Sequence, residues 1–458
     1  MFLSLSRTFT NTLKWPIGSI PKSLYYNRSI ELSTLSNGVR VASQFWDGPV
    51  ATIGVMIEAG SRNETLHNSG VAHYLEHMHF KGTKKRTKSQ LEIEVENMGG
   101  ALNAFTSRDT TLFYIEVIKE NCLNALDIIS DQLLNSSYLD EYISEERHTI
   151  LREAEEVAKD MRETLLEDLH NGVFRDHILG QPILGCTRSI KKINKSQLKR
   201  FTETHYLADR IVVLGVGNIQ HDQLMNMANT FIGNVPKTSS FAPDGEHSAV
   251  YSPSLVTTLD ESAKFSHFAM FMPAPNWNDP DYWAFLLLQR IIGDYSSAKA
   301  MRIDDPELKN NKLHKDLDDV TGIKKHECLF IPYKDVGVIG HYLSCVHETA
   351  PEACEALFKT FKHFVDDLDD SEVICGKNRI FNELLNIELG SDIAQTIGAQ
   401  LIYLKRLVSR SEIAEQVARY DAKTLKSVLA KYFHKDNISV AIRGPRKVIE
   451  QSLKKLSK

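Results

Sequence analysis

Two histidines and a glutamate lie within one short segment near the start of the chain. His73, Glu76 and His77 form the pattern H-x-x-E-H, and the apolar spacing over residues 70–80 predicts a helix there. Residues i and i+4 of a helix share a face, so the two imidazoles can hold one divalent metal ion. The carboxylate of Glu76 lies close to the same face. These residues predict a zinc site with Glu76 as a general base.

The motif alone does not complete such a site. In a chain of this composition, the expected number of H-x-x-E-H occurrences by chance is about 0.04. A helix that carries these histidines by chance therefore remains an alternative. A catalytic zinc also needs a third protein ligand and one open position. His79 lies on another face of the predicted helix, and we expect a structural role for it. The third ligand must therefore come from elsewhere in the chain.

Acidic residues are dense over 140–170, where we expect one long helix. Four of them recur every seven residues and so share one stripe of the helix: Glu146, Glu153, Asp160 and Glu167. Glu155, Glu156 and Glu163 lie beside this stripe. Spacing does not choose a zinc ligand among them, and a solvated acidic face accounts for most.

The composition excludes several other classes of protein. The chain has 458 residues, of which 42% are hydrophobic and 25% charged, as in soluble globular proteins. A net charge of −5 argues against a nucleic-acid partner. Six scattered cysteines without a C-x-x-C pair indicate a reducing compartment. The glycine pair Gly215 and Gly217 lacks the third glycine of a dinucleotide-binding loop.

The first 30 residues predict a targeting segment. They contain four basic residues, many hydroxyl side chains and no acid before Glu31, with apolar residues near helical spacing. This pattern is typical of a mitochondrial transit peptide, and an unstructured basic terminus is the alternative. Its removal would change the net charge of the chain from −5 to −9.

Beyond this segment the chain predicts an α+β fold of two related halves. We expect a first domain at 31–235, a linker at 236–253 and a second domain at 254–458. In the first domain, strands are expected at 39–46, 51–58, 102–106, 110–118 and 211–216, and helices at 69–80, 88–97, 122–135, 140–170 and 196–205. In the second, strands are expected at 255–259, 265–271, 327–332, 337–345 and 438–443.

A shift of 227 residues supports the duplication. At this shift several residues of the first half recur in the second: Leu198, Lys199, Asp209, Ile211, Val213 and Gly217 match Leu425, Lys426, Asp436, Ile438, Val440 and Gly444. No H-x-x-E-H occurs in the second half. We therefore expect two similar α/β sandwiches, with a zinc site in the first only.

Several motifs taken together resemble one family. His73–His77 is followed by the segments 80–83, 96–99, 102–104 and 106–108, then by 146–153 and 333–335. This set is similar to the β subunits of mitochondrial processing peptidase, inverted-zincin metallopeptidases related to core proteins of complex III. The similarity extends from about residue 32 to the C-terminus and is densest across 50–220.

The resemblance implies a role for particular residues. Glu153 would be the third ligand of one Zn²⁺ per chain, and Glu146 a supporting acid. Glu163 and Glu167 would receive an arginine near the cleavage site of a presequence. Asn103 and Ala104 lie in a segment that matches an edge strand to which the extended substrate adds.

The resemblance also implies partners and a location. The catalytic subunit would form a heterodimer with an α-type subunit that carries a glycine-rich loop, which this chain lacks at 276–294. It would remove presequences from imported precursors in the mitochondrial matrix or at the matrix face of the inner membrane. A core subunit of respiratory complex III is the main alternative, and the two roles can coincide in one protein. A peptidase that degrades presequences is a weaker alternative, because such relatives are generally longer.

Overall fold

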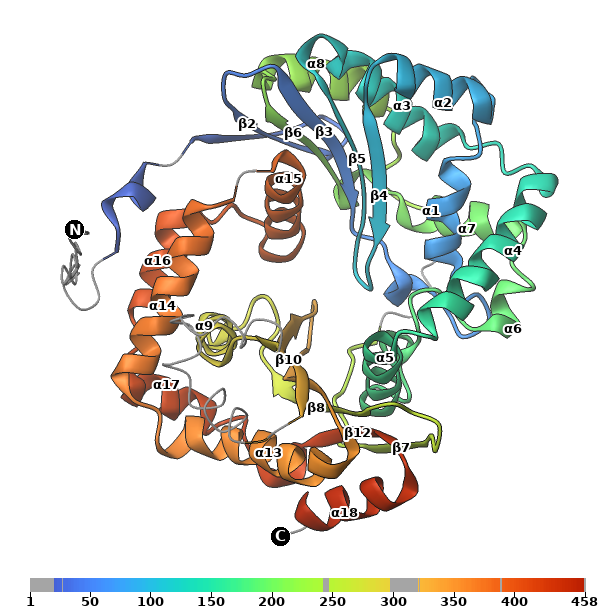
Figure 1. Cartoon of the computed structure of the whole chain (residues 1–458). Helices are drawn as coiled ribbons and strands as arrows, with labels where there is room; N and C mark the ends of the chain where they lie inside the picture. The colour runs from blue at the N-terminus through green and yellow to red at the C-terminus, as the bar shows by residue number, and fades with distance from the viewer. Residues whose placement is uncertain are drawn as a thin grey trace, which may run out of the picture.

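The computed structural model describes residues 20–26, 28–241, 247–296, 320, 322–387 and 389–456. In these ranges the chain forms two six-stranded sheets, one from each half of the sequence, with helices packed against them (Figure 1). The predicted α+β fold of two duplicated halves is thereby confirmed. Within the described ranges, no helix is both long and apolar enough to cross a membrane.

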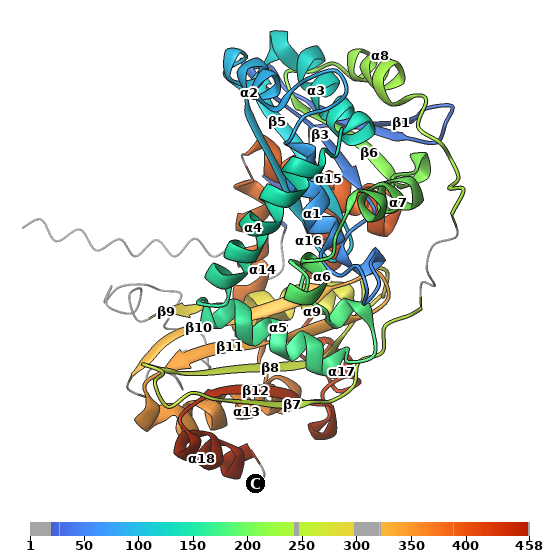
Figure 2. The ribbon, with the colours of Figure 1, turned by 90° about the vertical axis from the view of Figure 1, so that its right-hand side faces the viewer.

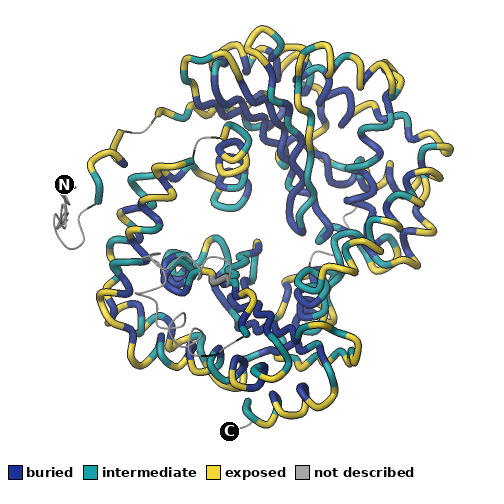
Figure 3. The backbone as a smooth tube through the Cα atoms, viewed as in Figure 1, coloured by how far each residue is buried: buried dark blue, intermediate teal, exposed yellow. Residues whose placement is uncertain are grey.

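The first sheet has the strand order β1-β2-β6-β3-β5-β4. Its strands are β1 (Ile30–Thr34), β2 (Arg40–Phe45), β3 (Val50–Ile57), β4 (Ala101–Thr106), β5 (Thr111–Ile118) and β6 (Ile211–Gly217). The helices of this half are α1 (Val71–His79), α2 (Lys88–Asn97), α3 (Cys122–Asn135), α4 (Asp140–Val157), α5 (Met161–Val173), α6 (Thr187–Ile190), α7 (Lys195–His205) and α8 (His221–Ile232). Strands β3 and β6 are almost wholly buried (Figure 3) because both faces of the sheet are covered.

The second sheet has the strand order β7-β12-β8-β11-β10-β9. Its strands are β7 (Leu255–Leu259), β8 (Ser266–Ala274), β9 (Tyr295–Ser296), β10 (Ile323–Pro332), β11 (Gly337–Cys345) and β12 (Ser439–Gly444). Its helices are α9 (Tyr282–Ile292), α13 (Ala350–Asp366), α14 (Asp370–Leu385), α15 (Gly390–Ala399), α16 (Arg410–Ala418), α17 (Ala422–Leu429) and α18 (Arg446–Leu456).

Five strands of each sheet follow the same order, β2-β6-β3-β5-β4 in the first and β7-β12-β8-β11-β10 in the second. Strand β6 pairs parallel with β2 and antiparallel with β3. Strand β12 likewise pairs parallel with β7 and antiparallel with β8. The residues matched at a shift of 227 lie in α7 and α17, in the short turns before the strands, and at β6 and β12, so they occupy equivalent elements.

Each half also covers the sheet of the other, which the sequence did not predict. Helix α5 of the first half packs its Leu165 and Leu169 against Phe271 of the second sheet. Helix α15 of the second half packs Ile393 and Ile397 against the first sheet. Figure 1 shows α15 beside β3 and β6, and α5 beside β8. This exchange joins the halves through apolar contacts.

The predicted helix over 140–170 is wrong. The structure has two helices, α4 and α5, which change direction at residues 158–160 (Figure 2). The side chain of Asp160 accepts hydrogen bonds from the backbone N–H groups of Arg162 and Glu163, at 2.8 and 3.2 Å. Asp160 is therefore the N-cap of α5, and an aspartate in this position favours a new helix start over continuation. The stripe of acids on one helix does not exist.

Most of the predicted targeting segment lies outside the described residues, but its end does not. Residues 1–19 and 27 are not described. Leu24 is 1% exposed and packs in the core of the second half, and Ile30 is the first residue of β1. Strand β1 was not predicted. Residues 24 and 30 thus belong to the folded chain.

Candidate metal centre and active site

The start of α1 is fixed by a buried acid. The carboxylate of Glu64 accepts hydrogen bonds from the N–H groups of Gly70 and Ala72, at 2.7 and 2.8 Å. Gly70 has a φ of 93°, and a Cβ there would lie 2.5 Å from the carbonyl oxygen of Leu184. These contacts satisfy N–H groups that a helix start leaves unpaired. No sequence pattern pointed to Glu64.

Three side chains from two helices converge beside α1. The Nε2 atoms of His73 and His77 lie 3.7 and 3.3 Å from the two carboxylate oxygens of Glu153, which comes from α4. One ligand atom from each residue lies within 4.8 Å of the others. Donor atoms about 2.0–2.1 Å from a tetrahedral zinc ion would be about 3.3 Å apart. The two imidazoles and one carboxylate therefore fit zinc in chemistry and spacing.

A second acid orients His77. Its Nδ1 donates to Glu146 at 2.9 Å, and Lys81 donates to the other carboxylate oxygen at 2.7 Å. Glu146 is buried at 5% exposure. A carboxylate on the far ring nitrogen of a metal-binding histidine fixes its tautomer and ring direction. Glu146 thus leaves Nε2 of His77 facing Glu153 and His73.

The pKa values of His73 and His77 are shifted in opposite directions. Burial, followed by the charge of His77, lowers the pKa of His73 to about 4, so this ring is neutral at pH 7. Burial also lowers the pKa of His77, but hydrogen bonds to Glu146 and Glu153 outweigh it and raise the pKa to about 9. The two acids therefore favour the protonated form of His77. Its proton must leave before a metal can bind.

Glu76 points to the end of strand β4. Its Oε2 atom accepts a hydrogen bond from the hydroxyl of Thr106 at 2.5 Å. Burial raises the pKa of Glu76, and the bond from Thr106 acts in the opposite direction. A carboxylate with a raised pKa beside a metal site is suited to proton transfer. Thr106 belonged to a motif used for the resemblance, but its contact with Glu76 was not predicted.

The predicted edge strand is present. In the described part of the chain, β4 is the last strand on its side of the sheet and pairs only with β5. It carries the exposed Asn103, whose side-chain amide donates to Tyr114, and the half-buried Ala104. The strand ends at Thr106, beside Glu76. An extended peptide added to this edge would pass the metal ligands.

The two acids expected to receive a substrate arginine already contact arginines of this chain. Glu167 is bonded at 2.6 Å by Arg108, a buried residue that also donates to a backbone carbonyl. Glu163 is bonded by Arg162, which also contacts Glu327 of the second half. Neither carboxylate is therefore a free receptor, and Glu163 is the more accessible of the two, at 46% side-chain exposure against 25%.

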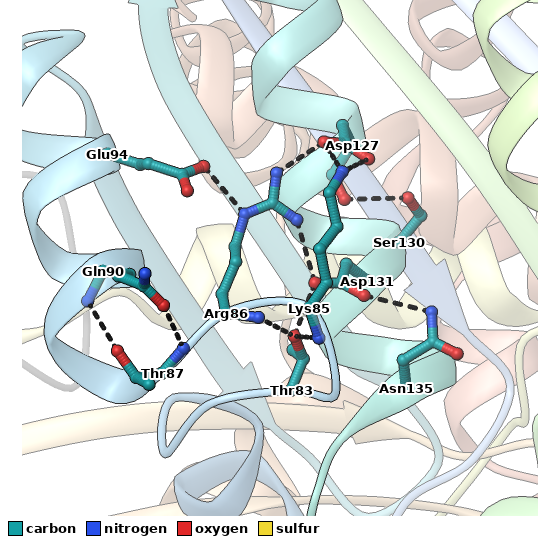
Figure 4. Close-up of polar contacts among 10 residues, drawn as sticks. All are labelled: Thr83, Lys85, Arg86, Thr87, Gln90, Glu94, Asp127, Ser130, Asp131 and Asn135. Carbon is teal, nitrogen blue, oxygen red and sulfur yellow. Dashed lines mark hydrogen bonds and ion pairs between the residues drawn. The ribbon is translucent and has the colours of Figure 1, made fainter.

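The loop that follows α1 is held by a buried arginine. Figure 4 shows Arg86 between three carboxylates: Glu94 at 2.7 Å, Asp131 at 2.8 Å and Asp127 at 2.5 Å. Thr83 adds a hydrogen bond to Asp131 at 2.6 Å. These contacts join the loop between α1 and α2 to α3, which packs on the sheet.

Comparison with known proteins identifies a family for the chain. Residues 40–187 match the model of the insulinase family of peptidases, family M16, and residues 192–379 match the model of the M16 inactive domain. The chain is 33% identical to the mitochondrial-processing peptidase subunit beta of Caenorhabditis elegans, over 93% of this chain and 91% of that protein. It is 32% identical to the subunit of the same name from Mus musculus, over 91% and 84%.

Two solved structures share the fold. One is a chain of complex III2 from Candida albicans, with a TM-score of 0.79 and 18% identity over 93% of this chain and 99% of that chain. The other is a protease from Helicobacter pylori, with a TM-score of 0.80 and 19% identity over 92% and 100%. At these identities the likeness concerns the fold alone.

Proposed function

Since the chain belongs to the insulinase family of peptidases, family M16, and is a metallopeptidase, we propose that it is the catalytic β-type subunit of a mitochondrial processing peptidase. The observation that carries this proposal is the meeting of His73, His77 and Glu153, with Glu76 beside them. The names of the relatives support the mitochondrial assignment.

His73, His77 and Glu153 would hold the metal, which we propose to be one zinc ion. Zinc, when bound, polarises a scissile carbonyl and acidifies water. Glu146 holds the His77 ring in position. Glu76 removes a proton from the attacking water and returns it to the leaving amine.

The proposed substrate is an extended, basic presequence. Strand β4 offers backbone groups along Asn103 and Ala104 for a peptide of variable sequence. Glu163 would pair a substrate arginine after exchanging its contact with Arg162, because that pair is partly solvated and such pairs are weak. Glu167 would stay with Arg108, whose pair is more buried. Glu167 would then support the site without contacting the arginine directly.

The proposed setting is the mitochondrial matrix, or the matrix face of the inner membrane, with an α-type subunit as partner. The complex III2 chain with the same fold favours one alternative, a core subunit of respiratory complex III. The two roles can coincide. Copurification with cytochrome subunits from detergent extracts would separate a complex III subunit from a free heterodimer.

The decisive experiment is cleavage of a presequence peptide by the chain with an α-type subunit. We expect Glu76→Gln to keep zinc, measured by mass spectrometry, and to lose about 10²–10⁴-fold in kcat. A chelator should abolish cleavage by the unchanged chain. Glu145→Gln is the matched control, because Glu145 is exposed on α4. An active Glu76→Gln variant would refute the mechanism.

A further inference from the structure

A cavity of about 810 Å³ lies on the side of the first sheet opposite to β4. We call it the β1-side cavity. It is bounded by the segment before β1, by the end of β2 and by α14, α15 and α16 of the second half. Its volume is in the range of small-molecule sites. It is distinct from the metal centre, since none of the metal ligands lines it.

Two arginines of the β1-side cavity have no carboxylate partner in the described part of the chain. The guanidinium of Arg28 lies 4.5 Å from the ring centroid of Trp46. Arg410 makes one long hydrogen bond, 3.5 Å, to the carbonyl of Ile387. The acid that lines the cavity, Glu412, is held at 3.0 and 2.7 Å by Arg406. The cavity therefore has two positive charges and no free negative charge among these groups.

The walls of the β1-side cavity are partly apolar and partly polar. Trp46, Ile393, Ile397, Leu407 and Ile413 are among the apolar residues. The amides that line it are engaged elsewhere. Gln400 accepts from the N–H of Val408 at 2.9 Å, and Gln44 donates to the carbonyl of Arg28 at 3.1 Å. What remains for a ligand is a partly apolar surface together with the two guanidinium groups.

The positive charges of Arg28 and Arg410 repel one another. Burial, followed by the positive charge of Arg28, lowers the pKa of Arg410. An anion between them would remove this repulsion, and guanidinium groups bind carboxylates and phosphates well because they donate two parallel hydrogen bonds.

We propose that the β1-side cavity binds an amphipathic anion, an acyl lipid with a carboxylate or phosphate head group. Arg28 and Arg410 pair the head group, and Trp46 with the isoleucines of α15 contacts the chain. The proposal does not depend on peptidase activity, so either can fail without the other. The source of the ligand is a free fatty acid or an anionic phospholipid, which share this chemistry.

Titration calorimetry of the full chain with dodecanoate tests the proposal. We expect saturable binding of one dodecanoate, at least tenfold tighter than that of dodecyltrimethylammonium, which has the same chain and the opposite charge. Arg28→Gln and Arg410→Gln should each weaken binding about tenfold. Arg419→Gln is the matched control, because Arg419 is exposed at the other end of α16 and does not line the cavity. Circular dichroism would confirm that each variant is folded.

Two further experiments identify the source of the ligand and test the contribution of the apolar walls. Vesicles of phosphatidylglycerol that bind the chain but not Arg410→Gln would indicate a phospholipid, while dodecanoate binding alone would indicate a free acid. Thr396→Phe, at an exposed position on the cavity lining, should narrow the cavity and weaken dodecanoate binding. Equal affinity for inorganic phosphate and dodecanoate, or unchanged binding by Arg410→Gln, would overturn the proposal.

Discussion

The helix that follows the second strand of the repeated unit differs between the two halves. In the first half it is α1, which carries His73, Glu76 and His77 after β3. In the second half it is α9, whose sequence YWAFLLLQRII follows β8 and is largely buried among apolar side chains. Five strands of each sheet share one order, yet only one of these helices carries metal-binding groups. A shared fold therefore places a helix, and its side chains decide whether it is a site or part of the core.

The halves also differ in how they use buried charge. Around α1 the first half holds Arg86 among three carboxylates and Glu146 between His77 and Lys81. The second half buries His326 and His341, which are joined by a hydrogen bond of 2.7 Å. A buried charge needs an opposite charge beside it, whereas a buried neutral histidine needs only hydrogen-bond partners. This contrast can be tested by four changes.

The largest effect is expected for Arg86→Leu. It would leave the buried Asp131 without its ionic partner, and we expect the free energy of unfolding to fall by about 3–5 kcal/mol. Chemical denaturation monitored by circular dichroism measures this. Arg443→Leu is the control from the second half, because its pair with Asp260 is more solvated and should matter much less. Equal losses would remove the contrast between the halves.

The buried histidine of the second half should make the fold sensitive to acid. Burial lowers the pKa of His341 to about 3, so below pH 6.5 the unfolded chain binds a proton that the folded chain does not. This group should cost about 2 kcal/mol of stability between pH 6.5 and 5, with the loss continuing toward pH 3.

The urea midpoint of His341→Gln should accordingly vary less with pH over this window than that of the unchanged chain. His434→Gln, at an exposed position, should retain the original dependence. Parallel curves for the unchanged chain and His341→Gln would contradict the assignment.

Glu146→Gln should weaken the metal site without removing a ligand. Loss of the carboxylate on Nδ1 of His77 is expected to lower zinc affinity about tenfold, or about 1.4 kcal/mol. Competition with a fluorescent chelator measures the affinity. Glu145→Gln, one residue earlier and exposed, should leave it unchanged. A normal affinity in Glu146→Gln would show that His77 is oriented by packing alone.

The smallest effect is expected for Arg162→Gln. Freeing Glu163 from this partly solvated pair should raise kcat/KM about two- to fivefold for presequences with an arginine near the cleavage site. Peptides with glutamine in that place should not respond. Lys159→Gln is the matched control, because it removes one positive charge three residues earlier but leaves Glu163 paired. Lys159 pairs with Glu156 instead, so we expect kcat/KM to stay unchanged in this variant. An equal rise in kcat/KM for both peptides would mean that Arg162 acts through the overall charge of the site and not by occupying Glu163.

Local features were predictable, and distant ones were not. The spacing of His73 and His77 defined a metal-binding pair because i and i+4 always share a helix face. Apolar segments bounded by polar residues predicted β3, β5, β6 and β11 to within about a residue at each end. In contrast, residue spacing left seven acids as candidates for the third ligand. The resemblance selected Glu153, and the structure places it beside both imidazoles.

The errors have a common physical cause. Periodicity continued through residues 158–160, but the side chain of Asp160 caps a new helix. The resemblance assigned a substrate arginine to Glu163 and Glu167, but the sequence does not show that Arg162 and Arg108 of the same chain reach them. Each error concerns which group a side chain meets, and periodicity carries no information on that.

By itself, then, the sequence determined the two-half organisation, most strands and the histidine pair, because these depend on helical and strand geometry within a few residues. Only the tertiary structure decided the rest. It brings Glu153 to the histidines, covers each sheet with a helix of the other half, and occupies Glu163 and Glu167 with arginines. These outcomes depend on contacts between groups far apart in the chain, which are set by burial and charge pairing in the folded molecule.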